Sequence, residues 1–178
     1  RLKSEEYKAL QKEVIAFLAT SWCSEEKAKL LMDLIVLTQP KICVEIGVFT
    51  GSSLLPVATT LKYLKQGKII GIDPWSNLEA IKHLSNDDPN KLWWQQLDMQ
   101  AVYGIFLQTV KSWKIHSYCE IMTKSSEEAA DQIASIDFLH FDGNYSEKSS
   151  NEDVRLFFPK VKIGGYILFS NAVLSVNS

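Results

Sequence analysis

The feature that most constrains the fold is a glycine turn at the end of one apolar run, with an acid closing the next run. Residues 44–53 read Val-Glu-Ile-Gly-Val-Phe-Thr-Gly-Ser-Ser, and residues 69–73 read Ile-Ile-Gly-Ile-Asp. In open α/β sheets such a pair of strands binds a nucleoside cofactor at the carboxyl ends of the strands. We expect Gly47 and Gly51 to let the backbone approach the ligand. The Asp73 carboxylate is expected to bind the ribose hydroxyls.

The spacing of this turn predicts which cofactor binds. Dinucleotide-binding folds carry G-x-G-x-x-G and hold pyrophosphate at a helix N-terminus. Here the pattern is E-x-G-x-x-x-G, with no third glycine and with Glu45 at the end of the run. A carboxylate repels phosphate but suits a ligand with an ammonium and a sulfonium, such as S-adenosylmethionine. Ser52 and Ser53 begin the next helix and are expected to hold the ligand's carboxylate. The alternative interpretation is a glycine-rich turn that binds nothing.

Apolar runs alternate with helical segments along most of the chain, which predicts an α/β fold with a doubly wound, mostly parallel sheet. Helical spacing is found over residues 4–19, 24–37, 52–65, 98–113, 126–133 and 150–158. The expected strands are 41–46, 68–72, 118–122, 136–141 and 165–169. We predict a single domain over residues 1–178, with an N-terminal helical layer (1–38) and a cofactor-binding α/β core (39–178).

Composition excludes several classes of protein. The chain has 178 residues, 46% of them apolar, and a formal charge of −2 with acids and bases interspersed. This balance gives no electrostatic footprint for nucleic acid, and no apolar run is long enough to span a bilayer. Three widely spaced cysteines, Cys23, Cys43 and Cys119, are interpreted as buried free thiols. They predict a cytoplasmic protein.

The segment 75–98 is longer than a strand-to-helix connection requires. It contains Trp75, Trp93 and Trp94. These tryptophans either line a substrate pocket or form a lid over the cofactor, or they cover the edge of the sheet.

Four segments of the chain resemble the class I S-adenosylmethionine-dependent methyltransferases, and most closely the small O-methyltransferase-like branch that includes the catechol and macrolide-sugar types. The segments are residues 45–51, 71–75, 136–143 and 158–166. The resemblance implies a Rossmann-like methyltransferase fold and methyl transfer to an oxygen of a small molecule, with no nucleic acid or membrane partner.

The resemblance also implies a set of site residues. Glu45 would lie near the ammonium of the cofactor, Ser53 at its carboxylate and Pro74-Trp75 on one face of its adenine. Asp142 would lie beside the methyl group and, as in metal-dependent members, on a magnesium ion. The full set expected to bind the cofactor is Glu45, Gly47, Phe49, Gly51, Ser53, Asp73, Pro74, Trp75, Ser125 and Asp142.

The residues expected to bind the methyl acceptor depart from the family pattern in two places. Many relatives carry a histidine where this chain has Tyr145, and an acid where it has Ser170. The catalytic residues expected are therefore Asp142 and Tyr145, with Tyr145 orienting the acceptor or acting as a base. Asp142 and Asn171 would form a weak site for Mg²⁺, which prefers oxygen ligands.

These departures keep other functions open. One alternative is a non-catalytic binding or scaffold protein that has retained the cofactor fold; another is a nicotinamide-dependent oxidoreductase, which fits Asp73 but not the glycine spacing. His140 is interpreted as a satisfied packing residue, and Asp153 as a capping residue near a helix start.

The C-terminal end of the sheet differs from that of the family. Class I methyltransferases have seven strands, so we expect the C-terminal strands to be missing from a sequence that stops at Ser178. The exposed edge of the fifth strand would then pair with a missing tail or with a second copy in a homodimer.

Overall fold

The computed structural model describes residues 2, 4–144 and 146–170 of the chain. A five-stranded parallel sheet forms its centre, in the order β3-β2-β1-β4-β5. The strands are β1 (Ile42–Ile46), β2 (Lys68–Ile72), β3 (Cys119–Met122), β4 (Ile136–Phe141) and β5 (Val161–Phe169). The predicted doubly wound α/β fold is confirmed.

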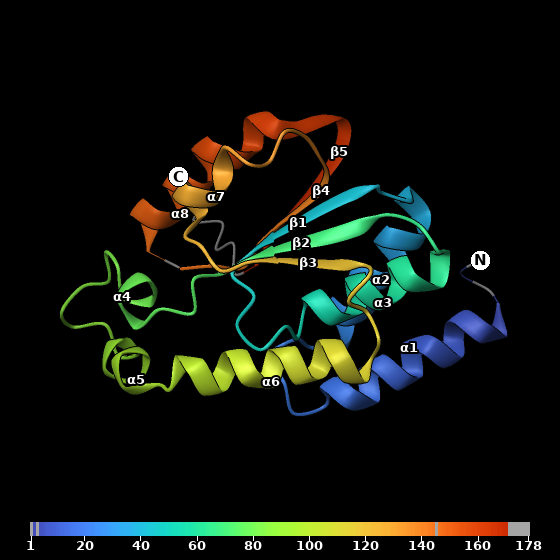
Figure 1. Ribbon diagram of the computed structural model, residues 1–178, viewed down its shortest axis with the longest axis horizontal. Helices are drawn as coiled ribbons and strands as arrows, with labels where there is room; N and C mark the ends of the chain where they lie inside the picture. The colour runs from blue at the N-terminus through green and yellow to red at the C-terminus, as the bar shows by residue number, and fades with distance from the viewer. Residues whose placement is uncertain (1, 3, 145, 171–178) are drawn as a thin grey trace, which may run out of the picture.

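Helices cover both faces of this sheet (Figure 1). One face carries α1 (Glu5–Leu18), α2 (Glu25–Thr38), α3 (Leu54–Leu64) and α6 (Met99–Ser112). The other carries α7 (Ser126–Ala130) and α8 (Glu147–Phe157), with η1 (Phe158–Lys160) leading into β5. Two short helices, α4 (Asn77–Ala80) and α5 (Lys91–Gln96), lie between β2 and α6.

Local sequence signals explain where the N-terminal helices begin. The Ser4 and Ser24 hydroxyls accept hydrogen bonds from the amides of Tyr7 and Lys27 and so cap α1 and α2. Acidic residues follow each cap in the first turn, where they suit the positive end of the helix dipole. Both helices therefore follow the prediction within two residues.

The last strand departs from prediction. β5 begins at Val161, four residues before the expected start at 165, and its pairing with β4 shifts register between Ile136 and Phe138. Gly164 lies in the shifted segment with a φ of +82°. The predicted strand began one residue after this glycine, whereas in the structure the glycine allows the strand to absorb an irregularity and continue.

β5 is also the least buried strand in the part of the chain that the structure describes. Ile163, Tyr166 and Phe169 are exposed. No helix among the described residues has the length and apolar character needed to cross a membrane.

Candidate active site

A cavity of about 760 Å³ lies where the strands end at their carboxyl side. Ile46, Ile72 and Asp142, at or just beyond the ends of β1, β2 and β4, are among its lining residues. This volume is within the range of about 300–1,000 Å³ typical of small-molecule sites.

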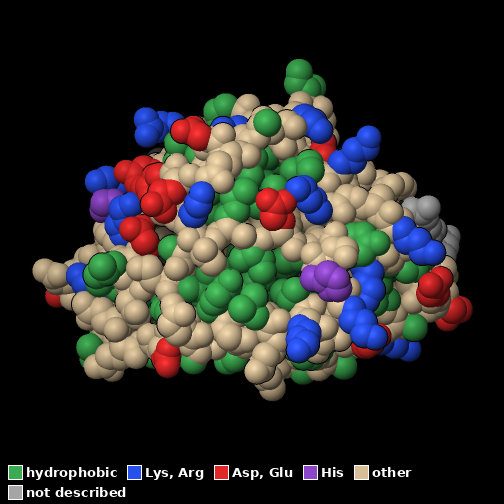
Figure 2. All heavy atoms as spheres, in the orientation of Figure 1, with side chains coloured by type: hydrophobic (Ala, Val, Ile, Leu, Met, Phe, Trp, Pro, Cys, Tyr) green, Lys and Arg blue, Asp and Glu red, His purple; other side chains and the backbone are tan. Residues whose placement is uncertain are grey.

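Acidic side chains outnumber basic ones around this cavity. The acids are Glu26, Asp73, Glu79, Glu127, Asp142, Glu152 and Asp153, and the bases are Lys27 and Lys82. Figure 2 shows acidic side chains gathered over α8, which forms part of the wall. The excess of carboxylates favours a ligand that carries positive charge.

Asp73 organises the turn that follows β1. Its Oδ2 accepts hydrogen bonds from the amides of Val48 and Phe49, at 2.9 and 2.8 Å, and its Oδ1 accepts one from the amide of Trp75 at 2.7 Å. Burial raises the pKa of the Asp73 carboxyl, and the three amides oppose that shift. Asp73 thus lines the cavity as expected, and it also fixes the backbone of the turn.

Internal packing requires both glycines of the turn. Gly47 has a φ of +83°, and a Cβ there would lie 2.4 Å from the carbonyl oxygen of Asp142. Gly51 has a φ of +79°, and its Cβ would lie 2.5 Å from the ring of Phe106. Gly47 lines the cavity, whereas Gly51, which was also expected beside the ligand, is not among the lining residues. Gly51 is needed because α6 packs against the turn.

Glu45 was expected near the ammonium of the cofactor, and the structure places it in the interior. Glu45 is fully buried and is not among the residues that line the cavity. Its Oε1 accepts a hydrogen bond from Ser53 Oγ at 2.5 Å. A serine hydroxyl has a single proton, so Ser53 has only lone pairs left for the cavity that it lines. Those lone pairs suit a donor such as an ammonium, whereas the sequence predicted contact with a carboxylate.

His140 lies directly across from Glu45 in the pairing of β1 with β4. It is fully buried, and its Nε2 lies 2.9 Å from Ser170 Oγ. Its Nδ1 lies 3.4 Å from Glu45 Oε2, and neither of these two atoms has a hydrogen-bond partner among the described residues. The interpretation of His140 as a satisfied packing residue therefore holds for only one of its ring nitrogens.

Lys27 brings a positive charge to the same cluster. It lies in the first turn of α2, and its Nζ is 2.7 Å from Asp142 Oδ2 and 2.6 Å from Ser170 Oγ. The Lys27 and Asp142 side chains are 24% and 17% exposed, so the ion pair is shielded from bulk water. No sequence pattern marked Lys27 for this role, because it is one of two lysines in a helix interpreted as a packing layer.

Aromatic side chains form one end of the cavity. This aromatic rim consists of Trp22, Phe49, Trp93 and Trp94, and the rings of Trp22 and Phe49 stack at 4.8 Å with an interplanar angle of 12°. Trp22, Phe49 and Trp94 line the cavity. Trp22 is 64% exposed, which makes it a stacking surface open to solvent. The pocket-lining alternative for the tryptophans thus holds for Trp94.

Trp75 has a different place. It is 4% exposed and packs against Tyr103 and Phe106 of α6, and its Nε1 donates a hydrogen bond to the carbonyl of Phe49 at 2.9 Å. Trp75 was expected to cover the adenine, but its indole belongs to the core and is not among the residues that line the cavity. Its neighbour Pro74 does line the cavity.

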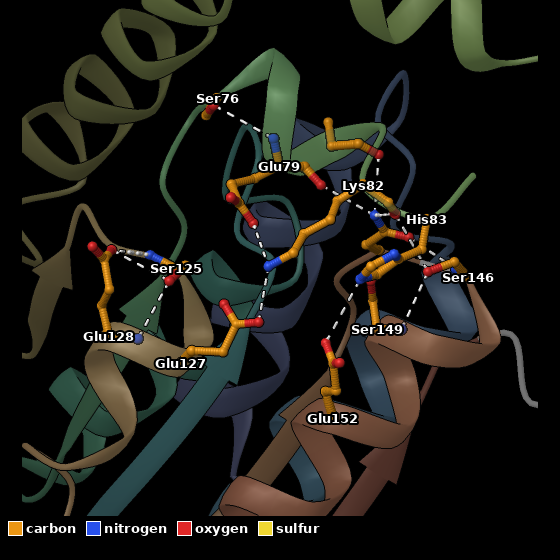
Figure 3. Close-up of polar contacts among 12 residues, drawn as sticks. Ser76, Glu79, Lys82, His83, Ser125, Glu127, Glu128, Ser146, Ser149 and Glu152 are labelled. Carbon is orange, nitrogen blue, oxygen red and sulfur yellow. Dashed lines mark hydrogen bonds and ion pairs between the residues drawn. The ribbon is translucent and has the colours of Figure 1, made fainter. Parts of the chain in front are cut away.

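A polar network joins the α4 segment to the opposite helices (Figure 3). Lys82 Nζ lies 2.9 Å from Glu127 on α7 and 3.4 Å from Glu79 on α4. The side-chain amide of Asn144, from the loop after β4, donates to the carbonyls of Glu79, Ala80 and Lys82. These contacts hold the α4 segment in place as a wall of the cavity.

Asp153 lies in the second turn of α8 and not at its start, because the N-cap is Ser146. It is buried, lines the cavity, and has a pKa raised to about 6, mainly by burial and further by the charges of Glu127 and Glu152. The capping interpretation of Asp153 is wrong. Pattern alone could not separate a capping acid from one buried against the cavity.

The structure brings together most of the predicted cofactor set. Residues of that set that line the cavity are Gly47, Phe49, Ser53, Asp73, Pro74, Ser125 and Asp142. Two predicted catalytic or metal residues, Tyr145 and Asn171, lie outside the described residues.

The parallel order of the strands, with an acid-lined cavity at their carboxyl ends, defines a Rossmann-like cofactor-binding protein. The sequence model of the methyltransferase-domain family matches residues 44–172. The chain therefore belongs to this family, and the prediction of a methyltransferase is confirmed. The match does not favour the alternative of a non-catalytic scaffold. A search of curated proteins gave no match to the sequence.

Solved structures with the same fold include three methyltransferases. One is the methyltransferase PaMTH1 of Podospora anserina with bound S-adenosylhomocysteine (SAH), with 14% identity, a TM-score of 0.61, and coverage of 90% of this chain and 61% of that one. Another is the O-methyltransferase TomG of Streptomyces achromogenes, which is involved in tomaymycin synthesis and was solved with S-adenosylmethionine (16% identity, TM-score 0.53, coverage 86% and 61%). The third is an O-methyltransferase of Bacillus cereus with SAH (14%, 0.51, coverage 87% and 63%). The chain thus spans about three fifths of each of these proteins, and the likeness shows the fold.

Proposed function

We propose that this chain binds S-adenosylmethionine in the cavity at the strand ends and transfers its methyl group to an oxygen of a small molecule. The observation that carries the proposal is the acid-lined cavity at the carboxyl ends of β1, β2 and β4, in a member of the methyltransferase-domain family. The cofactors of PaMTH1, TomG and the Bacillus cereus enzyme support S-adenosylmethionine. The last two are O-methyltransferases, which supports oxygen as the acceptor atom.

The residues present fit this cofactor. The excess of carboxylates around the cavity suits a sulfonium and an ammonium. Ser53 offers lone pairs and no free proton, which suits the ammonium, and Asp73, which lines the cavity, would bind the ribose hydroxyls. Pro74 and Ser125, which line the cavity, would contact the adenine, and Gly47 would lie beside the methionine portion.

When bound, S-adenosylmethionine supplies an activated methyl group, which leaves the sulfonium as the acceptor oxygen forms the new bond to carbon. The protein's task is then alignment of the acceptor and removal of its proton. Asp142 is the carboxylate that lines the cavity at the end of β4, and we assign it the proton. Tyr145 would orient the acceptor. The aromatic rim would hold a planar, partly apolar acceptor by stacking.

The test uses SAH and calorimetry. Wild-type protein should bind SAH, and Ser126→Trp should weaken binding at least tenfold, because Ser126 lines the cavity and the indole would fill it. Ser117→Trp, at an exposed site between α6 and β3, is the matched control and should bind as wild type.

A second arm tests the reaction itself. Labelled S-adenosylmethionine is incubated with catechols, phenolic acids and sugars, and label should move to an acceptor oxygen. If wild-type protein neither releases heat nor gains thermal stability with SAH, the cofactor assignment is wrong. If SAH binds but no acceptor is labelled, the non-catalytic alternative is favoured.

A further inference from the structure

The carboxylate of Asp142 already faces a cation supplied by the chain itself. Lys27 Nζ donates hydrogen bonds to Asp142 Oδ2 at 2.7 Å and to Ser170 Oγ at 2.6 Å. These two oxygens stand at the carboxyl ends of β4 and β5, where the family resemblance implies the magnesium site of metal-dependent members. The ammonium therefore stands beside the predicted ligand of the metal.

The described part of this site does not fit a divalent ion while Lys27 is in place. Magnesium needs oxygen ligands at about 2.0–2.1 Å and nearly ideal octahedral geometry. An ion bound to Asp142 Oδ2 would lie close to the ammonium, and the two positive charges would repel each other in a shielded site. Ser170 offers only a neutral hydroxyl, which already contacts both Lys27 and His140.

We propose that the ammonium of Lys27 takes the place of the divalent ion and binds the acceptor oxygen during transfer. An ammonium has three donors. Two of them are directed at Asp142 and Ser170, and Lys27 lines the cavity, so the third is available to an oxygen of a ligand. The acceptor hydroxyl would give its proton to Asp142 while its oxygen, held by Lys27, forms the bond to the methyl carbon.

The fold holds Lys27 in this position. α2 is capped by Ser24, and its buried face, with Ala28 and Leu31, is part of the core. The ammonium thus reaches the ends of β4 and β5 from a fixed helix on one face of the sheet. This arrangement differs from a lysine on a surface loop, whose charge would be free to move away from an arriving ion.

A titration with Mn²⁺ alone tests the proposal and requires neither cofactor nor acceptor. Wild-type protein should bind Mn²⁺ at least tenfold more weakly than Lys27→Met, which leaves Asp142 unpaired next to Glu45 and His140. Adding Asp142→Asn to Lys27→Met should remove the gain. Lys29→Met is the matched control, because Lys29 is an exposed residue of the same helix and pairs with Glu25. Equal affinity of wild type and Lys27→Met, at any value, would overturn the proposal.

A measurement on wild-type protein covers the case in which Lys27→Met does not fold. Mn²⁺ broadens the NMR signals of nuclei near its site, so the amide signals of Gly143 and Ser170 should keep their intensity in a large excess of Mn²⁺. Selective loss of these two signals would place a metal at Asp142 and overturn the proposal. The proposed role in transfer rests on the proposed function, but both measurements are independent of SAH binding. A failure of either proposal can therefore be told from a failure of the other.

Discussion

The two halves of the sheet place their polar groups at the cavity in different ways. On the β1–β2 side, Asp73 is held by three backbone amides from its own turn and the neighbouring one. On the β4–β5 side, Asp142 is held by the side chain of Lys27, 115 positions away in the sequence. In the first half backbone amides hold the carboxylate. In the second half a side chain holds it, and only the tertiary fold brings the two residues together.

This difference bears on how each half works. A carboxylate bonded to backbone amides fixes the shape of the turn before any ligand arrives, which lowers the ordering cost of binding. A carboxylate paired with a lysine can exchange its partner when a ligand offers another donor. We therefore assign rigid cofactor recognition to the β1–β2 half, and exchange of partners during transfer to the β4–β5 half.

The largest effect should come from Asp73→Ala. Removing the carboxylate leaves the amides of Val48, Phe49 and Trp75 without their acceptor, and we expect the free energy of unfolding to fall by about 3–5 kcal/mol. SAH binding should be lost with it. Urea unfolding and calorimetry measure the two changes.

Asp142→Ala is the matched variant in the other half. It removes one charged hydrogen-bonded contact, between side chains that are 24% and 17% exposed, where Asp73→Ala removes three, so the loss of unfolding free energy should be about 2 kcal/mol. Equal losses in the two variants would show that the halves do not differ in the way described.

An effect smaller than that of Asp73→Ala, with a defined pH dependence, should come from Asp153→Asn. The pKa of Asp153 is raised from 3.8 in the unfolded chain to about 6 in the folded protein, mainly by burial. Between these values the folded state keeps a proton that the unfolded state has lost, so wild-type stability falls as pH rises and levels off above about 6.

Because an asparagine does not titrate, Asp153→Asn removes the loss of stability that the wild-type protein shows as pH rises toward 6. Relative to its effect below pH 3.8, Asp153→Asn should gain about 1–3 kcal/mol of unfolding free energy above pH 6. Urea unfolding of both proteins at several pH values measures the difference. A gap between the two proteins that stays constant with pH would contradict the burial of an ionisable carboxyl against the cavity.

Most of the fold could be predicted because its signals are local. The caps at Ser4 and Ser24 and the alternation of apolar runs with helical segments are written in short stretches of sequence. The early start of β5 could not be predicted, because Gly164 continues a strand only where β4 tolerates a shift of register. The helices α4 and α5 were missed because short helices carry little periodicity.

The part of the site that could be predicted is the part whose sequence signals are local. Asp73 and Gly47 come from strand ends, and parallel strands bring their carboxyl ends to one edge. Lys27 and Trp22 reach the cavity from the helical layer, and no local pattern marks them. Trp75 was expected at the cavity and lies in the core, because an aromatic residue after a strand can face the core as readily as a ligand.

The smallest change in stability should come from Trp22→Ala, which tests the aromatic rim outside both halves of the sheet. Trp22 is 64% exposed and stacks on Phe49, so its loss should lower the free energy of unfolding by less than about 1 kcal/mol. Because the aromatic rim is assigned to the acceptor, the Kd for SAH should change less than about threefold, while KM for the acceptor rises about tenfold. Trp22→Phe keeps a ring for stacking and should recover most of that KM. Calorimetry and initial rates measure these values, and a large loss of SAH affinity would instead place the rim on the cofactor.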